Sequence, residues 1–388
     1  MNLRIVVLLS IAHVITDVNQ GALPAILPFF ISEYGLTYSA AAAIVFATNS
    51  ASAVVQPAFG YAADRLSKPW LLPLAILVAG LGLGLTGVVH SYKVIIFLTI
   101  FSGVGIAAFH PQAARLINFG AGGKKGTTMS FFGLGGTLGF ALGPMLATTA
   151  LLAWGLKGTT ILIIPVTIMA TLIATQIPKF RILEHSEKEI NLKRIRQPGE
   201  DKWRSFGLLS VMIMGRSVIF FGLITFVPLY WTGYLHRSIA EGAIALSTLT
   251  LSGVVGNFFG GWLSDRIGLK KMTLLGFTLL AIVLPIFIMV ENPVLAFLLL
   301  IPIGFAHSST YSPSIVMGQE YLPNHIGFSS GVTLGMAVAF GGITAPFIGM
   351  IADQYGIWYS LALVASVPSL CLVLSAFLPT IQTPSLTT

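Results

Sequence analysis

Two ionisable side chains lie in long apolar segments, and their chemistry is the first indication of what the chain does. Asp17 lies in the apolar segment 5–31, and Arg216 lies in the apolar segment 205–232. If such segments cross a membrane, each charge costs roughly 2.5–3.5 kcal/mol on insertion scales, and charged groups there are usually functional. Asp17 is therefore predicted to bind a proton. A structural carboxylate that is bonded to its neighbours is the alternative.

Two histidines extend this chemistry. His13 precedes Asp17 by four residues, so the two side chains share one face of a helix. His110 directly precedes Pro111, and a proline inside a helix leaves the carbonyl one turn earlier without its hydrogen bond. An imidazole beside opened backbone suits the wall of a cavity. We predict that Asp17, His13 and His110 form a proton-coupling group, and ordinary packing is the alternative for both histidines.

Arg216 has three possible roles. A guanidinium presents a fork of donors to a carboxylate or phosphonate, so it is suited to bind the negative group of a substrate. It could instead pair with Asp17 while the site is empty, or it could belong to a fixed structural ion pair. Other polar and aromatic residues of the apolar segments are further candidates for substrate binding. These are Gln20, Phe109, Phe220, His307 and Tyr311.

The composition indicates which elements must position these residues. The chain has 388 residues, of which 55% are hydrophobic and 9% charged, with a mean hydropathy of +0.89. Soluble domains carry about 25% charged residues. In lipid only helices and closed barrels satisfy the backbone, and continuous apolar runs of about 20 residues are typical of helices. We predict an all-α membrane protein with twelve transmembrane helices over 5–31, 40–62, 70–89, 93–116, 127–150, 157–177, 205–232, 239–261, 272–290, 293–317, 328–351 and 357–379.

The basic residues predict how the helices are oriented. Lys and Arg favour cytoplasmic loops. With both termini in the cytoplasm, most of the 21 Lys and Arg residues lie on the cytoplasmic side. The exceptions are Lys93, Lys157, Arg216 and Arg237. We therefore expect cytoplasmic termini, a retained first helix rather than a signal peptide, and a multi-pass protein of a bacterial inner membrane.

One polar segment divides the chain. Residues 179–204 mix both charge signs and contain Pro198-Gly199. We expect an N-terminal six-helix bundle over 1–178, a cytoplasmic linker over 179–204, and a C-terminal six-helix bundle over 205–388. Trp203 lies among basic residues, which is typical of a short amphipathic helix on the membrane surface. We expect the linker to contain such a helix.

An internal repeat relates the two halves. Gly60, Asp64 and Arg65 form the pattern Gly-x-x-x-Asp-Arg after the second predicted helix, and the pattern recurs at an offset of 201 residues. The halves are therefore predicted to be pseudo-symmetric six-helix bundles in the same orientation. Each aspartate is a gating candidate, since a carboxylate is stabilised at the N-terminus of another helix. A plain positive turn is the alternative. The second copy of the pattern consists of Gly261, Asp265 and Arg266.

Glycines recur every fourth residue in the predicted helix 127–150. Gly135, Gly139 and Gly143 form this row, and small residues at that spacing let two helices pack closely. We expect close packing where this helix crosses between the halves, and such packing is compatible with sliding during transport.

These motifs resemble a known family. The paired Gly-x-x-x-Asp-Arg loops resemble the signature loop of the major facilitator superfamily, and four other segments resemble its fosmidomycin-resistance efflux proteins. The resemblance implies that Asp64 meets the predicted helix 328–351 and that Asp265 meets the helix 127–150. Gln112 stands where the family pattern has an acid, so a proton route through that acid is absent here. The four segments are AHVITD at 12–17, QPAFGY with KPW at 56–70, FHPQ at 109–112 and QEYLPNHIG at 319–327.

The sequence excludes several classes of protein. No phosphate-binding Gly-x-x-x-x-Gly-Lys-[Ser/Thr] loop, nucleophile elbow or metal-ligand spacing occurs, so we predict no enzyme, no cofactor and no metal site. The single Cys371 excludes a disulfide framework. The net charge of +8 is attributed to loops that face anionic lipid, rather than to nucleic acid.

The remaining function is transport by alternating access. We predict an antiporter that uses protons to export a small antibiotic-like or anionic compound, with the lipid bilayer as its environment and no need for an oligomer. An uptake symporter or facilitator for a nutrient is the first alternative. A receptor or scaffold without transport is the second, and the short loops disfavour it.

Overall fold

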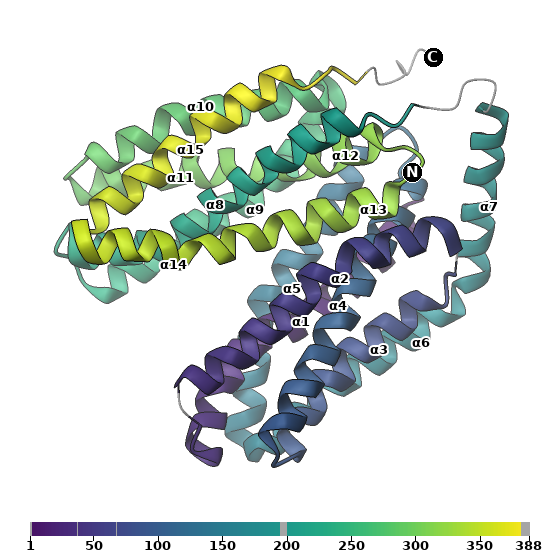
Figure 1. Ribbon diagram of the computed structural model, residues 1–388, viewed down its shortest axis with the longest axis horizontal. Coiled ribbons are helices and arrows are strands. Elements are labelled where there is room, and N and C mark those ends of the chain that lie inside the picture. The colour runs from purple at the N-terminus through teal and green to yellow at the C-terminus, as the bar shows by residue number, and fades with distance from the viewer. Residues whose placement is uncertain (1, 37, 67, 195–199, 382–388) are drawn as a thin grey trace. The chain divides into compact units, whose positions relative to one another are not determined.

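The computed structural model describes residues 2–36, 38–66, 68–194 and 200–381, and the regular structure of these residues is helical (Figure 1). Prolines and glycines mark many helix boundaries. α11 begins with Pro293 after Asn292, whose side chain accepts the N–H groups of Val294 and Leu295, a standard N-cap. α1 ends at Gly35, whose φ of 61° is left-handed and suits glycine.

The chain divides into two compact units. Unit 1 comprises Met1–Gly122, Phe131–Gly199 and Asn324–Met336, and unit 2 comprises Gly123–Ser130, Glu200–Pro323 and Ala337–Thr388. Each unit thus contains one short segment from the other half of the sequence. The predicted domain boundaries at 178 and 204 stay a prediction.

The helices of unit 1 come mainly from the first half of the sequence. They are α1 Leu3–Tyr34, α2 Tyr38–Leu66, α3 Leu71–Gly84, η1 Leu85–Val88, α4 Tyr92–Gly120, α5 Lys125–Trp154 from residue 131 onward, η2 Gly155–Leu162, α6 Ile163–Thr175, α7 Ile177–Arg194, α13 Ile326–Gly331 and the π-helical turn η3 Val332–Met336.

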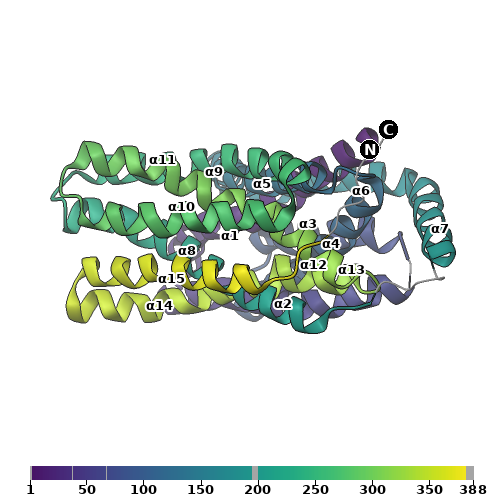
Figure 2. The same ribbon diagram turned by 90° about the horizontal axis from the view of Figure 1, so that it is seen from above.

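The helices of unit 2 come mainly from the second half. They are the first turn and a half of α5, α8 Trp203–Gly233, α9 Ile239–Ile267, α10 Leu269–Met289, α11 Pro293–Ser309, α12 Tyr311–Tyr321, α14 Ala337–Tyr355 and α15 Ile357–Phe377. Within this unit α10 packs along α11, and α14 packs along α15 (Figure 2).

The prediction of an all-α membrane protein is confirmed. Ten stretches of the described chain are long and apolar enough to cross a membrane. One of them, Lys125–Thr175, covers two predicted spans. α2 is not among the ten, and polar residues such as Asn49 and Gln56 interrupt its apolar sequence. Helices nevertheless cover all twelve predicted spans, while the side of the membrane on which the termini lie stays a prediction.

The exposed surface is apolar where lipid is expected. Leu152, Met289 and Phe377 are each more than 70% exposed on spanning helices, a position that water would disfavour and lipid does not. Inside unit 1, an apolar core forms where α1 meets its neighbours. Its buried members include Val18, Leu23, Ile26, Phe30, Ile44, Leu83, Ile95 and Leu151.

The linker departs from the prediction at its end. α7 begins at Ile177 and ends at Arg194, and residues 195–199 lie outside the described residues. Trp203 is not part of this helix, because it begins α8, where its ring meets the ring of Phe206 edge to face. The prediction that Trp203 belongs to an amphipathic linker helix is wrong.

Candidate functional site

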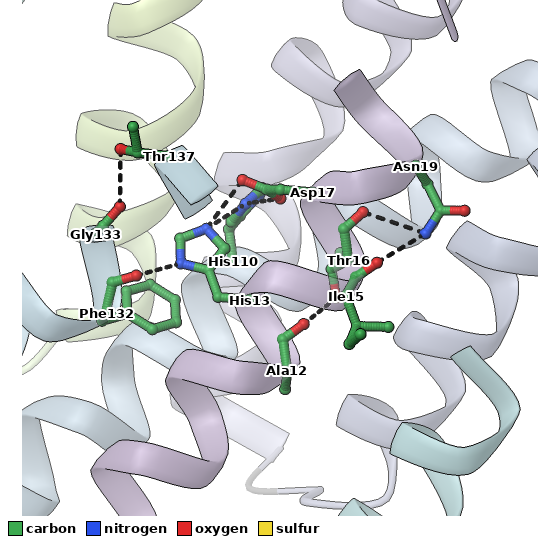
Figure 3. A network of polar contacts seen from close by, with 10 residues as sticks. All are labelled: Ala12, His13, Ile15, Thr16, Asp17, Asn19, His110, Phe132, Gly133 and Thr137. Atoms are coloured by element: carbon green, nitrogen blue, oxygen red, sulfur yellow. Dashed lines mark hydrogen bonds and ion pairs between the residues drawn. The ribbon is translucent and has the colours of Figure 1, made fainter. Parts of the chain in front are cut away.

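Asp17 lies between two imidazoles inside unit 1. Its Oδ2 is 3.2 Å from Nε2 of His13, and its Oδ1 is 3.1 Å from Nε2 of His110 (Figure 3). The two Nε2 atoms are themselves 3.1 Å apart. Asp17 is 8% exposed and His13 3% exposed, so this group, the triad, is almost withdrawn from solvent. The structure thus brings together the three residues for which a proton-coupling role is predicted, and that role stays a prediction.

Three helices position the triad. His13 and Asp17 are one turn apart on α1, and His110 comes from α4. α5 supplies the third wall, where the carbonyl oxygen of Phe132 lies 2.7 Å from Nδ1 of His13. The carbonyl can only accept, so the Nδ1 of His13 donates. Figure 3 shows the ring of His13 directed with one nitrogen at Phe132 and the other at Asp17.

Aromatic rings surround His13. The ring of Phe132 stacks on it with centroids 4.0 Å apart and planes inclined by 25°. Phe109, a predicted substrate-binding residue, is fully buried and lies 5.8 Å from the same imidazole. In the described structure Phe109 therefore packs behind His13, and its predicted contact with substrate stays a prediction.

Close packing of α5 on α1 keeps the triad compact. Cβ atoms at Gly135, Gly139 and Gly143 would come within 2.3–2.4 Å of carbonyl oxygens of α1. Gly136 faces the triad itself, where a Cβ would lie 2.6 Å from Nε2 of His13 and 2.9 Å from Oδ2 of Asp17. The predicted glycine row is thus a packing surface, but its partner is α1 of the same half of the sequence. The expectation that the row lies where the halves cross stays a prediction.

Arg216 occupies a comparable buried position in unit 2. It is 6% exposed, and its Nε has no hydrogen-bond partner in the described structure. Its guanidinium lies 4.9 Å from the centroid of the Tyr311 ring, a cation–π contact. The Nε2 of His307 donates to the carbonyl oxygen of Arg216 at 3.1 Å. No ion pair of Arg216 occurs within the described residues of its unit.

The other predicted substrate residues lie around these two centres. Phe220 is 38% exposed and stacks on His307 with ring centroids 5.5 Å apart, so Arg216, Tyr311, His307 and Phe220 form one cluster in unit 2. Gln20 is half-buried on α1, one turn beyond the triad. The pairing of Arg216 with Asp17 and the substrate contacts of all these residues stay predictions.

Asp64 lies at a helix N-terminus. Its Oδ1 and Oδ2 accept the backbone N–H groups of Gly327 and Phe328 at 2.8 and 2.9 Å, both in α13 of unit 1. A Cβ at Gly60 would lie 2.1 Å from the carbonyl oxygen of Gly327, so only glycine permits this approach. Asp64 follows the predicted span 40–62. Burial raises the pKa of the Asp64 carboxyl above its usual value, although these two N–H bonds act in the opposite direction.

Asp265 makes the equivalent contact in unit 2. Its carboxylate accepts the N–H groups of Gly126 and Thr127 at 2.8 and 2.9 Å, and the Thr127 hydroxyl at 2.6 Å. A Cβ at Gly261 would overlap Ser130. Nearby, Lys125 pairs with Glu320 at 2.5 Å. The elements that Asp64 and Asp265 meet are those that the resemblance implies, and the gating role of both loops stays a prediction.

The arginines that follow the two aspartates lie over aromatic rings of their own helices. Arg65 lies over the ring of Tyr61 at 4.6 Å, and Arg266 lies over the ring of Trp262 at 3.7 Å. In each case the ring is one turn earlier on the same helix. These contacts hold the arginine side chains along their own helices, so glycine and aspartate make the contacts with the facing helix.

Sequence reasoning missed Arg115. Only Arg216 is expected as a base within a span, yet Arg115 of α4 is also buried, at 5% exposure. Its Nε is 3.2 Å from Oδ1 of Asp64, and its Nη1 is 2.5 Å from Oε1 of Glu184 in α7. Arg115 therefore connects the last turn of α2 to α7. The signal that could have found it is a charged residue in the last turn of an apolar segment.

Gln112 has a structural contact. Its side-chain amide donates to the carbonyl oxygen of Lys68 at 3.0 Å, and the residue is 4% exposed. The amide joins α4 to the loop before α3. It can make this bond without changing its protonation state, which fits a structural position rather than a proton route.

The triad also concentrates donor atoms. Nitrogen and oxygen atoms of His13, Asp17 and His110 all lie within 4.8 Å of one another, a grouping that spacing along the sequence does not reveal because His110 is far along the chain. The prediction of no metal site stays a prediction. A chelator is therefore needed in any experiment that measures proton binding by these residues.

Helices long enough to cross a membrane, two similar halves and buried charged side chains are the features of a polytopic membrane transporter. The chain belongs to the Major Facilitator Superfamily, whose family model matches residues 9–343. Members of this superfamily handle small-molecule substrates within the membrane.

Two bacterial relatives span nearly the whole chain. The Fosmidomycin resistance protein of Escherichia coli (strain K12) is 28% identical over 377 residues, which cover 96% of this chain and 91% of that protein. The Uncharacterized MFS-type transporter YfnC of Bacillus subtilis (strain 168) is 29% identical over 384 residues, which cover 97% of this chain and 93% of that protein. The resemblance to the fosmidomycin-resistance group is confirmed.

Solved structures confirm the fold. The Major Facilitator Superfamily transporter FucP in the outward conformation has a TM-score of 0.77 at 13% identity, covering 97% of this chain and 99% of that chain. The human organic anion transporter MFSD10 (TETRAN) has a TM-score of 0.75 at 13% identity, covering 96% and 99%. At this identity the likeness concerns the fold alone.

Proposed function

We propose that this chain is a proton-coupled antiporter that exports a small compound by alternating access. The observation that carries the proposal is the position of Asp17, buried in a spanning helix with an imidazole at each carboxylate oxygen. An uncompensated carboxylate is costly there. A bound proton compensates the negative charge of the carboxylate. The charge of the triad then depends on which aqueous side of the membrane the triad exchanges protons with.

The triad lacks one proton when both of its imidazoles are neutral. Three heavy-atom contacts of 3.1–3.2 Å join Asp17, His13 and His110. If both imidazoles are neutral, the one ring proton of His13 is on Nδ1, which donates to the Phe132 carbonyl. The contact between Nε2 of His13 and Oδ2 of Asp17 then joins two acceptors. An additional proton turns this contact into a charge-assisted hydrogen bond, so the geometry favours a site that gains and loses one proton.

The substrate site is proposed to lie at Arg216. A buried guanidinium without an ion pair among the described residues of its unit has a desolvation cost that an anionic group would offset. Its fork of donors suits a carboxylate or phosphonate. His307, Phe220 and Tyr311 surround it with aromatic surface. A small antibiotic-like molecule with an acidic group fits this chemistry, and the name of the Escherichia coli relative makes fosmidomycin the first probe.

The Asp64 and Asp265 contacts are proposed to act as gates. Each joins the last turn of one helix to the N-terminus of a helix from the other half of the sequence through two N–H bonds. Hydrogen bonds to a charged acceptor contribute about 1.5–3 kcal/mol, strong enough to favour a closed gate and weak enough to break within a cycle. We place this gate on the cytoplasmic side of a bacterial inner membrane, with a monomer as the working unit.

Transport into proteoliposomes tests the proposal. The compound is chosen first, by comparing the antibiotic resistance of cells that carry the chain with cells that carry Asp17→Asn. An antiporter accumulates this compound in vesicles that are acidic inside. With one proton exchanged per molecule, a pH difference of about one unit supplies about 1.4 kcal/mol, which gives about tenfold accumulation.

Two controls sharpen the result. Glu33→Gln removes an exposed acid from the same helix as Asp17, and we expect it to leave accumulation unchanged, while Asp17→Asn abolishes it. A chelator is present throughout. Accumulation that ignores the pH difference, or full coupling by Asp17→Asn, would overturn the proposal. Accumulation in vesicles that are alkaline inside would instead identify an uptake symporter.

A further inference from the structure

We propose that the transported proton resides on Nε2 of His13 and that Asp17 remains an ionised counter-ion. In this proposal the Phe132 carbonyl positions the imidazole of His13 by accepting the hydrogen bond from its Nδ1. The inference rests on the proposed function, because it names the atom that carries the proton in that cycle. It also revises the sequence-based prediction in which the carboxyl of Asp17 is the carrier.

The Phe132 carbonyl fixes one nitrogen of the ring. Its oxygen lies 2.7 Å from Nδ1 of His13, and a carbonyl has no proton to give. Nδ1 therefore holds a proton in every state in which this bond persists. The second nitrogen, Nε2, is the only one that can change, and it points toward Asp17 rather than toward the carbonyl (Figure 3).

The proton between His13 and Asp17 has two possible positions. It lies on Nε2 and is donated to the carboxylate, or it lies on Oδ2 and is donated to the imidazole. The two atoms are 3.2 Å apart. N–H···O bonds extend to about 3.2 Å, whereas hydroxyl donors prefer about 2.7–2.8 Å. The separation thus favours the nitrogen as the donor.

The intrinsic proton affinities point the same way. In model peptides an imidazole binds a proton more tightly than an aspartate carboxylate does, so we expect a proton shared by the two to belong to the imidazole. The other contact of the carboxylate also favours this position of the proton. His110 places its Nε2 3.1 Å from Oδ1 of Asp17, so the carboxylate has a donor at each oxygen and is stabilised as an anion.

Aromatic faces also favour an imidazolium at this position. Phe132 stacks on the ring of His13 at 4.0 Å, and Phe109 lies 5.8 Å away, distances at which a ring attracts a cation. The titratable groups that contact His13 within unit 1 are Asp17 on α1 and His110 on α4. The neighbours of His13 on α5 are Phe132 and Gly136, which carry no titratable group. No second acid is in contact in the described part of this unit, so one imidazolium and one carboxylate form a neutral pair.

Infrared difference spectroscopy of the purified full-length protein tests the assignment. Spectra are recorded between alkaline and acidic buffer, in the presence of a chelator, with natural and ¹⁵N-labelled histidine. We expect acidification to produce an imidazolium band that moves with the label and is lost in His13→Gln. We do not expect a carbonyl band from a protonated Asp17 carboxyl group, which would be a band that disappears in Asp17→Asn.

The outcomes separate the inference from the proposed function. A protonated-carboxyl band that disappears in Asp17→Asn overturns the assignment to His13 but leaves a proton-binding triad. The absence of both bands, together with transport that ignores the pH difference, overturns both. If His13→Gln does not fold, the comparison of the wild-type protein with Asp17→Asn still decides whether the carboxyl carries the proton. His110→Gln must retain the imidazolium band, and its loss there instead would assign the proton to His110.

Discussion

Nε2 of His110 on α4 lies 3.1 Å from Oδ1 of Asp17 on α1, so a contact between two helices completes the proposed proton site. The same nitrogen is 3.1 Å from Nε2 of His13. His110 can therefore donate to the carboxylate in the protonated state and turn to the free Nε2 of His13 when the proton leaves. It gives the triad a donor in both states.

His110→Gln is expected to weaken coupling without abolishing it. The glutamine amide retains a donor but cannot follow the proton, so the carboxylate of Asp17 loses part of its stabilisation. Loss of a hydrogen bond to a charged group costs about 1.5–3 kcal/mol. We therefore expect the proton concentration that gives half-maximal transport to shift at least roughly tenfold. The measurement is the pH profile of substrate exchange in proteoliposomes. An unchanged profile would show that His110 merely packs against Asp17.

Gly136→Ala is expected to disrupt the triad while the protein still folds. The new Cβ would lie 2.6 Å from Nε2 of His13, so the imidazole must leave its place between Phe132 and Asp17. We expect accumulation driven by the pH difference to be lost. Gly207→Ala is the matched control, because nothing lies within 4 Å of a Cβ there. Equal activity of the two variants would contradict the proposed packing of α5 on the triad.

Much of the fold follows from the sequence, because lipid imposes a simple rule on composition. Apolar runs and their lengths locate the helices, and the repeated Gly-x-x-x-Asp-Arg pattern relates the halves. Asp17 and His13 are also predictable as neighbours, since one turn of a helix separates them. The approach of His110 depends on how α4 packs on α1, which the spacing of residues along the chain does not determine.

Several contacts of the candidate site could not be predicted from the sequence, and the reasons are physical. The carbonyl of Phe132 is a backbone atom, and every residue has one, so no residue type marks its contact with His13. Arg115 and Glu184 lie 69 residues apart, and their pairing depends on where α7 turns back along α4. The basic neighbours of Trp203 indicate a linker, although the helix α8 already includes this residue.

Asp64→Asn is expected to destabilise the protein more than Asp265→Asn. Both variants lose charge-assisted bonds to two backbone N–H groups. Asp64 also faces the buried Arg115, and removing one partner of a buried ion pair leaves the other charge uncompensated. Glu184 still pairs with Arg115, so we expect a difference of about 1–3 kcal/mol rather than complete unfolding. Thermal unfolding of the two variants in detergent provides the comparison, and a larger loss for Asp265→Asn would contradict it.

Arg216 variants are expected to discriminate between substrates by charge. Arg216→Gln removes the guanidinium fork, and the loss of hydrogen bonds to a charged group, about 1.5–3 kcal/mol, should raise the KM for an acidic substrate at least tenfold. A neutral analogue should be affected little. Arg216→Lys keeps the charge but loses the planar fork, so we expect an intermediate KM. Arg204→Gln, at an exposed arginine of the same helix, is the control.

Two results would contradict an anion subsite at Arg216. Equal loss for acidic and neutral substrates indicates a structural arginine, since a substrate contact must depend on the charge of the substrate. Recovery of activity in the double variant Asp17→Asn/Arg216→Gln indicates an ion pair between the two residues, because removing both charges then relieves the cost of leaving one unpaired. An anion subsite predicts neither, because the double variant lacks both the proton site and the group that holds the substrate, and its activity must stay as low as that of Asp17→Asn alone.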